Sequence, residues 1–122
     1  MKISPEDVKK FVDKLPPLKK GGIDFTAYSA HVEEDGRLVL RVVIRNGSGQ
    51  KLTLKKLPLG VRDAQGRDVA TGLFMMEDFA IEANSAHLKT FKFPAPALIL
   101  PDADLSKVSI YIAEGVKKEI KH

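Results

Sequence analysis

The sequence predicts a mainly β protein: an antiparallel β-sandwich of about seven strands in two sheets, preceded by one short helix. Three observations favour this class. Apolar and polar residues alternate along several short segments, which is the period of a half-buried strand. Gly, Pro and Asn lie between these segments, at positions suited to turns. The 122 residues match the size of one domain and suffice for an independent core, so residues 1–122 are treated as a single domain.

The opening segment predicts a helix over residues 5–15. Ser4-Pro5-Glu6-Asp7 supplies an N-cap, a proline at the first helical position and two carboxylates near the positive end of the helix dipole. Pro16-Pro17 ends the helix. One apolar stripe recurs at helical spacing: Val8, Phe11, Val12 and Leu15. Such a short helix is unstable alone, so we expect it to pack on the sheet or on a partner.

Residues 37–47 form the central predicted strand. Asn46-Gly47-Ser48-Gly49 then suggests a reversal, and the alternation resumes over residues 50–54. We therefore predict a hairpin whose inner face is aliphatic (Leu38, Leu40, Val42, Ile44) and whose outer face is basic (Arg37, Arg41, Arg45). Val39 and Val43 also lie on the outer face. They either belong to a mixed apolar and basic binding patch or are buried by the helix, and the second interpretation is favoured because exposed valines at a strand centre usually find cover.

Further strands complete the predicted sandwich over residues 22–114. They cover residues 23–32, 57–61, 68–74, 87–93 and 107–113, with a short crossing segment at 75–81. Pro58 cannot donate a ladder hydrogen bond, so its segment is expected at an edge or a bulge. The charged residues 115–122 are expected to form a mobile tail.

Composition limits the classes of function and the compartment. The chain has no cysteine, which excludes disulfides and thiolate metal sites. It shows neither a signal-peptide pattern nor an apolar run near the ~20 residues of a membrane span. We therefore expect a cytoplasmic or membrane-peripheral protein without a span, or a cell-surface protein if the sequence is truncated.

The net charge of +4 is concentrated in one half of the chain. Residues 1–61 hold 12 Lys/Arg and 7 Asp/Glu, whereas residues 62–122 hold 8 and 9. The candidate binding residues are the basic side chains expected on the outer face of the hairpin: Arg37, Arg41, Arg45, Lys51 and Lys55. They suit an acidic partner or a phosphate, or serve only solubility. No aromatic residue interleaves the arginines, which disfavours nucleic acid or another anionic polymer, kept as the alternative ligand.

No group of residues forms a catalytic or metal-binding pattern. His31, His87 and His122 have no neighbouring motif that pairs them with Ser or Asp, so they are expected at the surface or rim. Asp102-Ala103-Asp104 and Glu77-Asp78 offer fewer oxygens than Ca²⁺ prefers, and they suit turns better. The sequence therefore predicts no catalytic residue, no metal and no cofactor.

Four segments, in this order, resemble the SLAP domain family of firmicute S-layer assembly proteins associated with an accessory Sec system. They are Pro16-Pro17-Leu18-Lys19-Lys20-Gly21, Ile44-Arg45-Asn46-Gly47, Gly66 to Phe74 and Ser85 to Phe93. The resemblance spans roughly residues 14–113 of the chain; an FxLYD-like or another immunoglobulin-like module is the alternative relative.

The resemblance implies an immunoglobulin-like fold and a non-enzymatic protein-interaction module. Such a module would assist the secretion or assembly of surface-layer proteins, with a secretion or S-layer component as its protein partner. It carries over no catalytic residue. We also expect that an edge strand near Pro58, or the N-terminal helix, can mediate a homo-oligomer.

Overall fold

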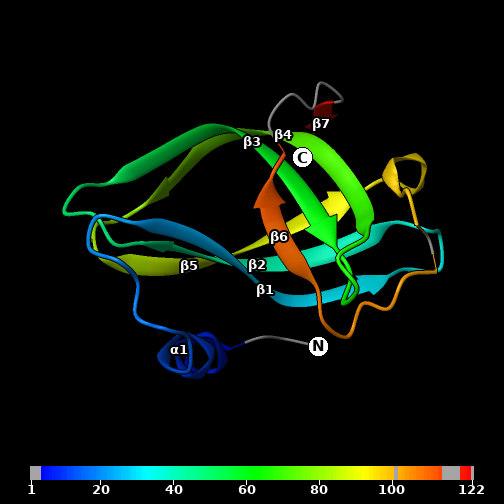
Figure 1. The fold of residues 1–122 in the computed structure, drawn as a ribbon. Helices are drawn as coiled ribbons and strands as arrows, with labels where there is room; N and C mark the ends of the chain where they lie inside the picture. Colours follow the sequence, from blue (N-terminus) through cyan, green and yellow to red (C-terminus); the bar gives the residue numbers. More distant parts are fainter. Residues whose placement is uncertain (1–3, 101, 114–118, 122) are drawn as a thin grey trace.

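The computed structural model describes residues 4–100, 102–113 and 119–121. They form two packed sheets with one helix outside them (Figure 1). Sheet A has three strands in the order β1-β2-β5, and sheet B has four in the order β6-β3-β4-β7. The elements are α1 (Pro5–Asp13), β1 (Ile23–Val32), β2 (Leu38–Asn46), β3 (Leu52–Arg62), β4 (Asp68–Ile81), β5 (Ser85–Phe93), the 3₁₀ turn η1 (Ala95–Ala97), β6 (Ser109–Ile112) and β7 (Glu119–Lys121). The predicted β-sandwich with a short N-terminal helix is confirmed.

The core lies between the two sheets and follows the alternation seen in the sequence. The four inward-facing aliphatic residues of β2 are fully buried: Leu38, Leu40, Val42 and Ile44. Phe74 of β4 packs edge-on against Phe91 and Phe93 of β5, with ring centroids 4.9 Å apart in both pairs. These aromatic contacts join sheet B to sheet A across the interior, where they add to the burial of apolar area.

The predicted central hairpin is wrong. β2 pairs with β1 and β5 in sheet A, whereas β3 pairs with β4 and β6 in sheet B. The segment between β2 and β3 therefore crosses from one sheet to the other instead of reversing within one sheet. Alternation shows which face of a strand is buried. It is the same whether the next strand is joined by a hairpin in the same sheet or by a crossing to the other sheet, so it could not distinguish the two.

Strands β3 and β4 are longer than the sequence pattern predicted. The interruption at Lys55-Lys56 is a shift of register between Leu54 and Lys56 within one continuous strand. This bulge restores the inward position of Leu57, which is buried. Residues 75–81, predicted as a crossing segment, continue β4. The predicted edge position of Pro58 is wrong, because β3 lies between β6 and β4, so no edge strand is present there for the expected oligomer; Pro58 follows the bulge by two residues.

Helix α1 lies on the outer face of sheet A, on the side away from sheet B (Figure 1). Ser4 and Asp7 form a capping box at its start, and the helix ends at Asp13, two residues before the predicted end. Phe11 packs against Tyr28 of β1 with ring centroids 5.0 Å apart. Val39 and Val43 are 3% and 0% exposed, so β2 is buried on both faces and the two valines do not form an exposed binding patch.

The end of the chain adds one short strand. Residues 119–121 form β7, which runs parallel to β4 beside residues 73–75. The mobile tail expected over residues 115–122 therefore includes a strand at residues 119–121, and its mobility stays a prediction; residues 115–118 and 122 lie outside the described part of the chain. Among the described residues, no helix has the length and apolar character needed to cross a membrane.

Candidate functional site

The five predicted basic residues do not form one surface. Arg41 and Arg45 belong to β2 of sheet A and Arg37 directly precedes it, whereas Lys51 directly precedes β3 of sheet B and Lys55 lies within β3. The expectation that the lysines project beside the arginines is wrong, because it depended on the hairpin between β2 and β3.

The Arg45 side chain binds other residues of this chain. Its guanidinium binds both carboxylate oxygens of Asp24 on β1, with Nε 2.9 Å from Oδ1, and its Nη1 donates to the carbonyl oxygen of Pro16 at 3.0 Å. The hydrogen bond to Asp24 raises the pKa of Arg45, and its side chain is only 12% exposed. Arg45 therefore fastens the connector after α1 to sheet A, and Asp24 neutralises its charge.

The other four basic residues are dispersed. Arg37 lies in the turn before β2 and pairs with Asp35 at 2.7 Å. Lys51 Nζ lies 3.8 Å from Glu82 Oε1, and both side chains are well exposed. Exposed pairs of this kind contribute about 0–1 kcal/mol to stability. Lys55 is exposed at the bulge of β3. Arg41 is half-buried and has no acidic partner among the described residues. The structure thus provides isolated cations instead of a continuous basic face.

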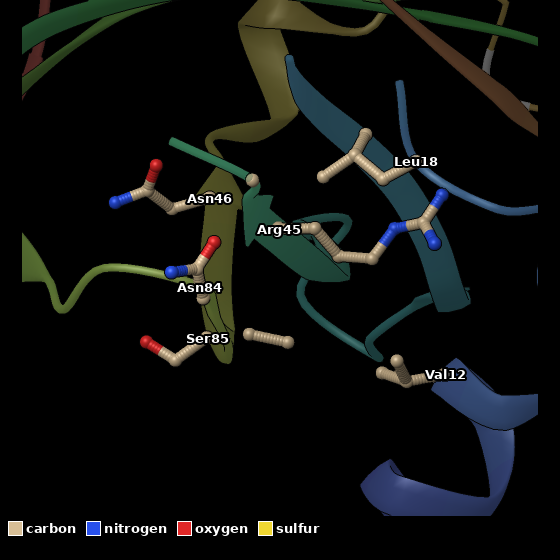
Figure 2. Close-up of a pocket in the computed structure, with 8 residues that line it drawn as sticks. Val12, Leu18, Arg45, Asn46, Asn84 and Ser85 are labelled. Carbon is tan, nitrogen blue, oxygen red and sulfur yellow. The ribbon is translucent and has the colours of Figure 1, made fainter. Parts of the chain in front are cut away.

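One end of the sandwich brings together three of the segments that resemble the family. The connector at residues 18–22, the crossing segment at 46–50 and the turn at 82–85 meet there, around a hollow of about 240 Å³ (Figure 2). Its lining residues are Val12, Leu18, Arg45, Asn46, Gly47, Asn84, Ser85 and Ala86. Leu18 packs so closely on Gly47 that a Cβ there would lie 2.7 Å from Leu18 Cδ2. A larger residue at this position would have to displace the end of the Leu18 side chain.

The side chain of Asn46 holds this end together. It is 1% exposed, and its Nδ2 donates to the carbonyl oxygens of Gln50, Ile81 and Glu82 at 2.8, 3.1 and 3.2 Å. Its Oδ1 accepts hydrogen bonds from the backbone N–H and the hydroxyl of Ser48. One amide therefore links the end of β2 in sheet A to the crossing segment and to the end of β4 in sheet B. The sequence suggested a turn residue here, and nothing in the local pattern distinguishes a turn from this link between sheets.

A second region lies at an open edge of the sandwich, where β1 of sheet A and β6 of sheet B border their sheets on the same side (Figure 1). A hollow of about 200 Å³ separates the two strands. Its lining residues are Ile23, Asp24, Phe25, Ile110, Tyr111 and Ile112. Ile23 and Ile112 are each 42% exposed, which makes them two of the four large apolar residues exposed on the described surface. We call this hollow with its two bordering strands the edge slot.

A model of the SLAP domain family matches residues 2–114. The chain belongs to the SLAP domain family. No significant match was found among curated proteins or among solved structures. The match covers α1 and strands β1 to β6. It therefore includes both the end of the sandwich that Asn46 holds together and the edge slot.

In this SLAP domain, strand β6 is anchored from its outer face. The ring of Tyr111 lies over Gly60, where a Cβ would be 2.2 Å from the ring. The Tyr111 hydroxyl donates to Asp68 at 2.8 Å, and the guanidinium carbon of Arg62 is 3.9 Å from the ring centroid. Burial and the bond to Asp68 raise the pKa of Tyr111. These contacts fix β6, so that Ile110 and Ile112 on its other face remain available to the edge slot.

The predicted histidines and carboxylates are spread over the SLAP domain. His31 lies on β1 and His87 on β5, where the His87 ring packs edge-on against Phe79 at 5.5 Å. Asp104 accepts hydrogen bonds from the backbone N–H and hydroxyl of Ser106, which lower its pKa and are typical of a turn. Within the described residues, no group of three or more His, Asp or Glu could hold a metal ion. The side chain of Asp78 and all of His122 lie outside the description.

Proposed function

We propose that this SLAP domain is a non-enzymatic interaction module that assists the secretion or assembly of bacterial surface-layer proteins, acting in the cytoplasm or at the membrane periphery. Membership in the SLAP family supports this role. The single observation that carries the proposal is the edge slot, in which an edge of β1 that has no partner among the described strands lies beside two exposed isoleucines.

The edge slot suits an extended segment of a partner chain. β1 pairs only with β2 among the described strands, so its other edge offers backbone N–H and C=O groups to a further strand. Five residues of β1, 23–27, precede the shift in its pairing register with β2 between Ala27 and Ser29. They span about 17 Å at the rise of a β-strand. A partner segment of this length would place aliphatic side chains against Ile23 and Ile112.

This mode of binding fits a role in secretion. A chain awaiting export is unfolded and presents extended backbone, and strand addition takes most of its affinity from main-chain hydrogen bonds. An anionic polymer finds less support as the ligand, because Arg45 and Arg37 already contact carboxylates of this chain. Such contacts reduce the charge available to phosphates.

The test measures binding of the domain to the unfolded precursor of a surface-layer protein from the same genome. Two variants, Ile23→Lys and Ile112→Lys, place a charge in the edge slot. Ile99→Lys is the matched control, because Ile99 is 59% exposed and does not line the slot. Each slot variant should weaken binding at least about tenfold, which corresponds to about 1.4 kcal/mol, while the control binds like the wild type. All three should keep the melting temperature within a few degrees of the wild type.

The outcomes distinguish an incorrect binding site from an incorrect function. Equal binding by all variants would place the contact elsewhere on the domain. Failure of the wild type to bind any surface-layer precursor would refute the proposed function. Pairing of two copies through β1 would instead give a dimer in the absence of precursor, which light scattering detects, and Ile23→Lys would dissociate it.

A further inference from the structure

The buried Asn46 is followed by Gly47. An Asn-Gly pair can deamidate, and the rate of this reaction depends on how freely the two residues can move. In a flexible Asn-Gly pair, the backbone nitrogen of glycine attacks the side-chain carbonyl carbon of asparagine. The new N–Cγ bond forms as the Cγ–Nδ2 bond breaks, and ammonia leaves with the proton from the glycine nitrogen. Water then opens the cyclic imide to aspartate or isoaspartate. Glycine favours the reaction because it has no Cβ to hinder the approach.

The folded domain holds both reacting groups in place. Asn46 is 1% exposed, and its amide takes part in five hydrogen bonds, three through Nδ2 and two through Oδ1. The attacking group is also occupied, because the Gly47 N–H donates to the carbonyl oxygen of Gly22 at 2.8 Å. The attack requires the Gly47 nitrogen to leave the Gly22 carbonyl and the Asn46 side chain to turn away from the partners that hold it.

The product of the reaction does not fit the site that Asn46 occupies. A carboxylate has no N–H to donate to the carbonyl oxygens of Gln50, Ile81 and Glu82, which would then face a buried negative charge. Isoaspartate would also add an atom to the backbone at the end of β2. A chain modified at this position therefore loses the link between its two sheets.

We propose that Asn46 is a deamidation site that folding closes and unfolding opens, and that its modification makes prolonged unfolding of this domain irreversible. The chemical step needs only water. Chains that fold promptly therefore keep Asn46, whereas chains that stay unfolded lose the side chain that links the two sheets. Chemical modification of the unfolded state is a recognised route to irreversible unfolding.

Peptide mapping by mass spectrometry tests this proposal. The full chain is incubated at mildly alkaline pH, native in buffer and unfolded in urea. The chain contains one other asparagine, Asn84, which is exposed and followed by Ser85, and it serves as an internal reference. In urea, Asn46 should convert faster than Asn84. In the native domain, the conversion of Asn46 should slow at least about tenfold, because it requires local opening.

Two further measurements complete the test. After dilution from urea, aspartate or isoaspartate at position 46 should be absent from the folded fraction and enriched in the unfolded one. Ser48→Ala removes one hydrogen bond to Asn46 Oδ1 and should raise the native rate while the domain still folds. Equal rates for Asn46 in the native and unfolded chain, or modified chains that refold with an unchanged melting temperature, would overturn the proposal. An unchanged native rate in Ser48→Ala would contradict the protective role of these bonds.

Discussion

Replacing Asn46 with alanine should destabilise the domain far more than its position in a crossing loop suggests. The substitution removes the only group that donates from β2 to the carbonyl oxygens of Gln50, Ile81 and Glu82 in the described structure. The contact with Ile81 is buried, so water cannot easily replace the amide there. The contacts with Gln50 and Glu82 are partly buried, and these two carbonyl oxygens keep hydrogen bonds from the hydroxyls of Ser48 and Ser85.

The size of the effect follows from these contacts. An unsatisfied buried carbonyl costs about 1–3 kcal/mol, and a solvent-accessible one costs less. The main contribution comes from the buried Ile81 carbonyl, so we expect a loss of about 1–3 kcal/mol in the free energy of unfolding. This is a large share of the roughly 5–15 kcal/mol that stabilises a typical domain.

Urea unfolding monitored by circular dichroism measures this loss. Gln50→Ala is the matched control, because it also removes a side-chain amide four residues away but leaves the Gln50 carbonyl oxygen that Asn46 binds. The control should stay within about 0.5 kcal/mol of the wild type. A loss below about 1 kcal/mol for Asn46→Ala, with an unchanged dependence on urea, would refute the link between the sheets.

Two further predictions concern other parts of the fold. Gly60→Ala should cost about 1–3 kcal/mol, because the new methyl group displaces the ring of Tyr111 from β3, whereas Gly49→Ala, with open space around it, should be nearly neutral in the same unfolding assay. The Asp63 carboxylate accepts hydrogen bonds from the backbone and side chain of Arg67, which lower its pKa. A lowered pKa in the folded state stabilises the domain above the ordinary aspartate value of 3.8, and this contribution is lost as the pH falls through the folded value. Asp63→Asn should therefore flatten the acid side of a plot of melting temperature against pH, and a slope equal to that of the wild type would contradict the assignment.

The sequence predicted the burial pattern of the strands more reliably than their pairing. Leu38, Leu40, Val42 and Ile44 are buried as predicted, because period-two alternation directly reports the face that leaves water. The same alternation is present whether the next strand is a neighbour or lies in the opposite sheet. The link through Asn46 therefore escaped prediction, since the carbonyl groups of Ile81 and Glu82 that it binds lie 35 and 36 residues away in the sequence.

The sequence pattern did not predict the edge slot either. Ile23 and Ile112 begin and end their strands, and both have the apolar character of core residues. Only the sheet order makes β1 and β6 border strands on the same side, which leaves these isoleucines partly exposed. Conversely, Arg45 is paired with Asp24 on β1 and Arg37 with Asp35 in its own turn, and β2 and β3 lie in different sheets, so the predicted basic face does not form.

Amide hydrogen exchange of the domain, with and without an unfolded surface-layer precursor, tests the central claim most directly. Strand addition at the edge slot predicts slower exchange over residues 23–27, where backbone N–H groups at the free edge gain partners, and an unchanged rate on β5, at the opposite border of sheet A. Unchanged exchange over residues 23–27 when the precursor is bound would contradict the account.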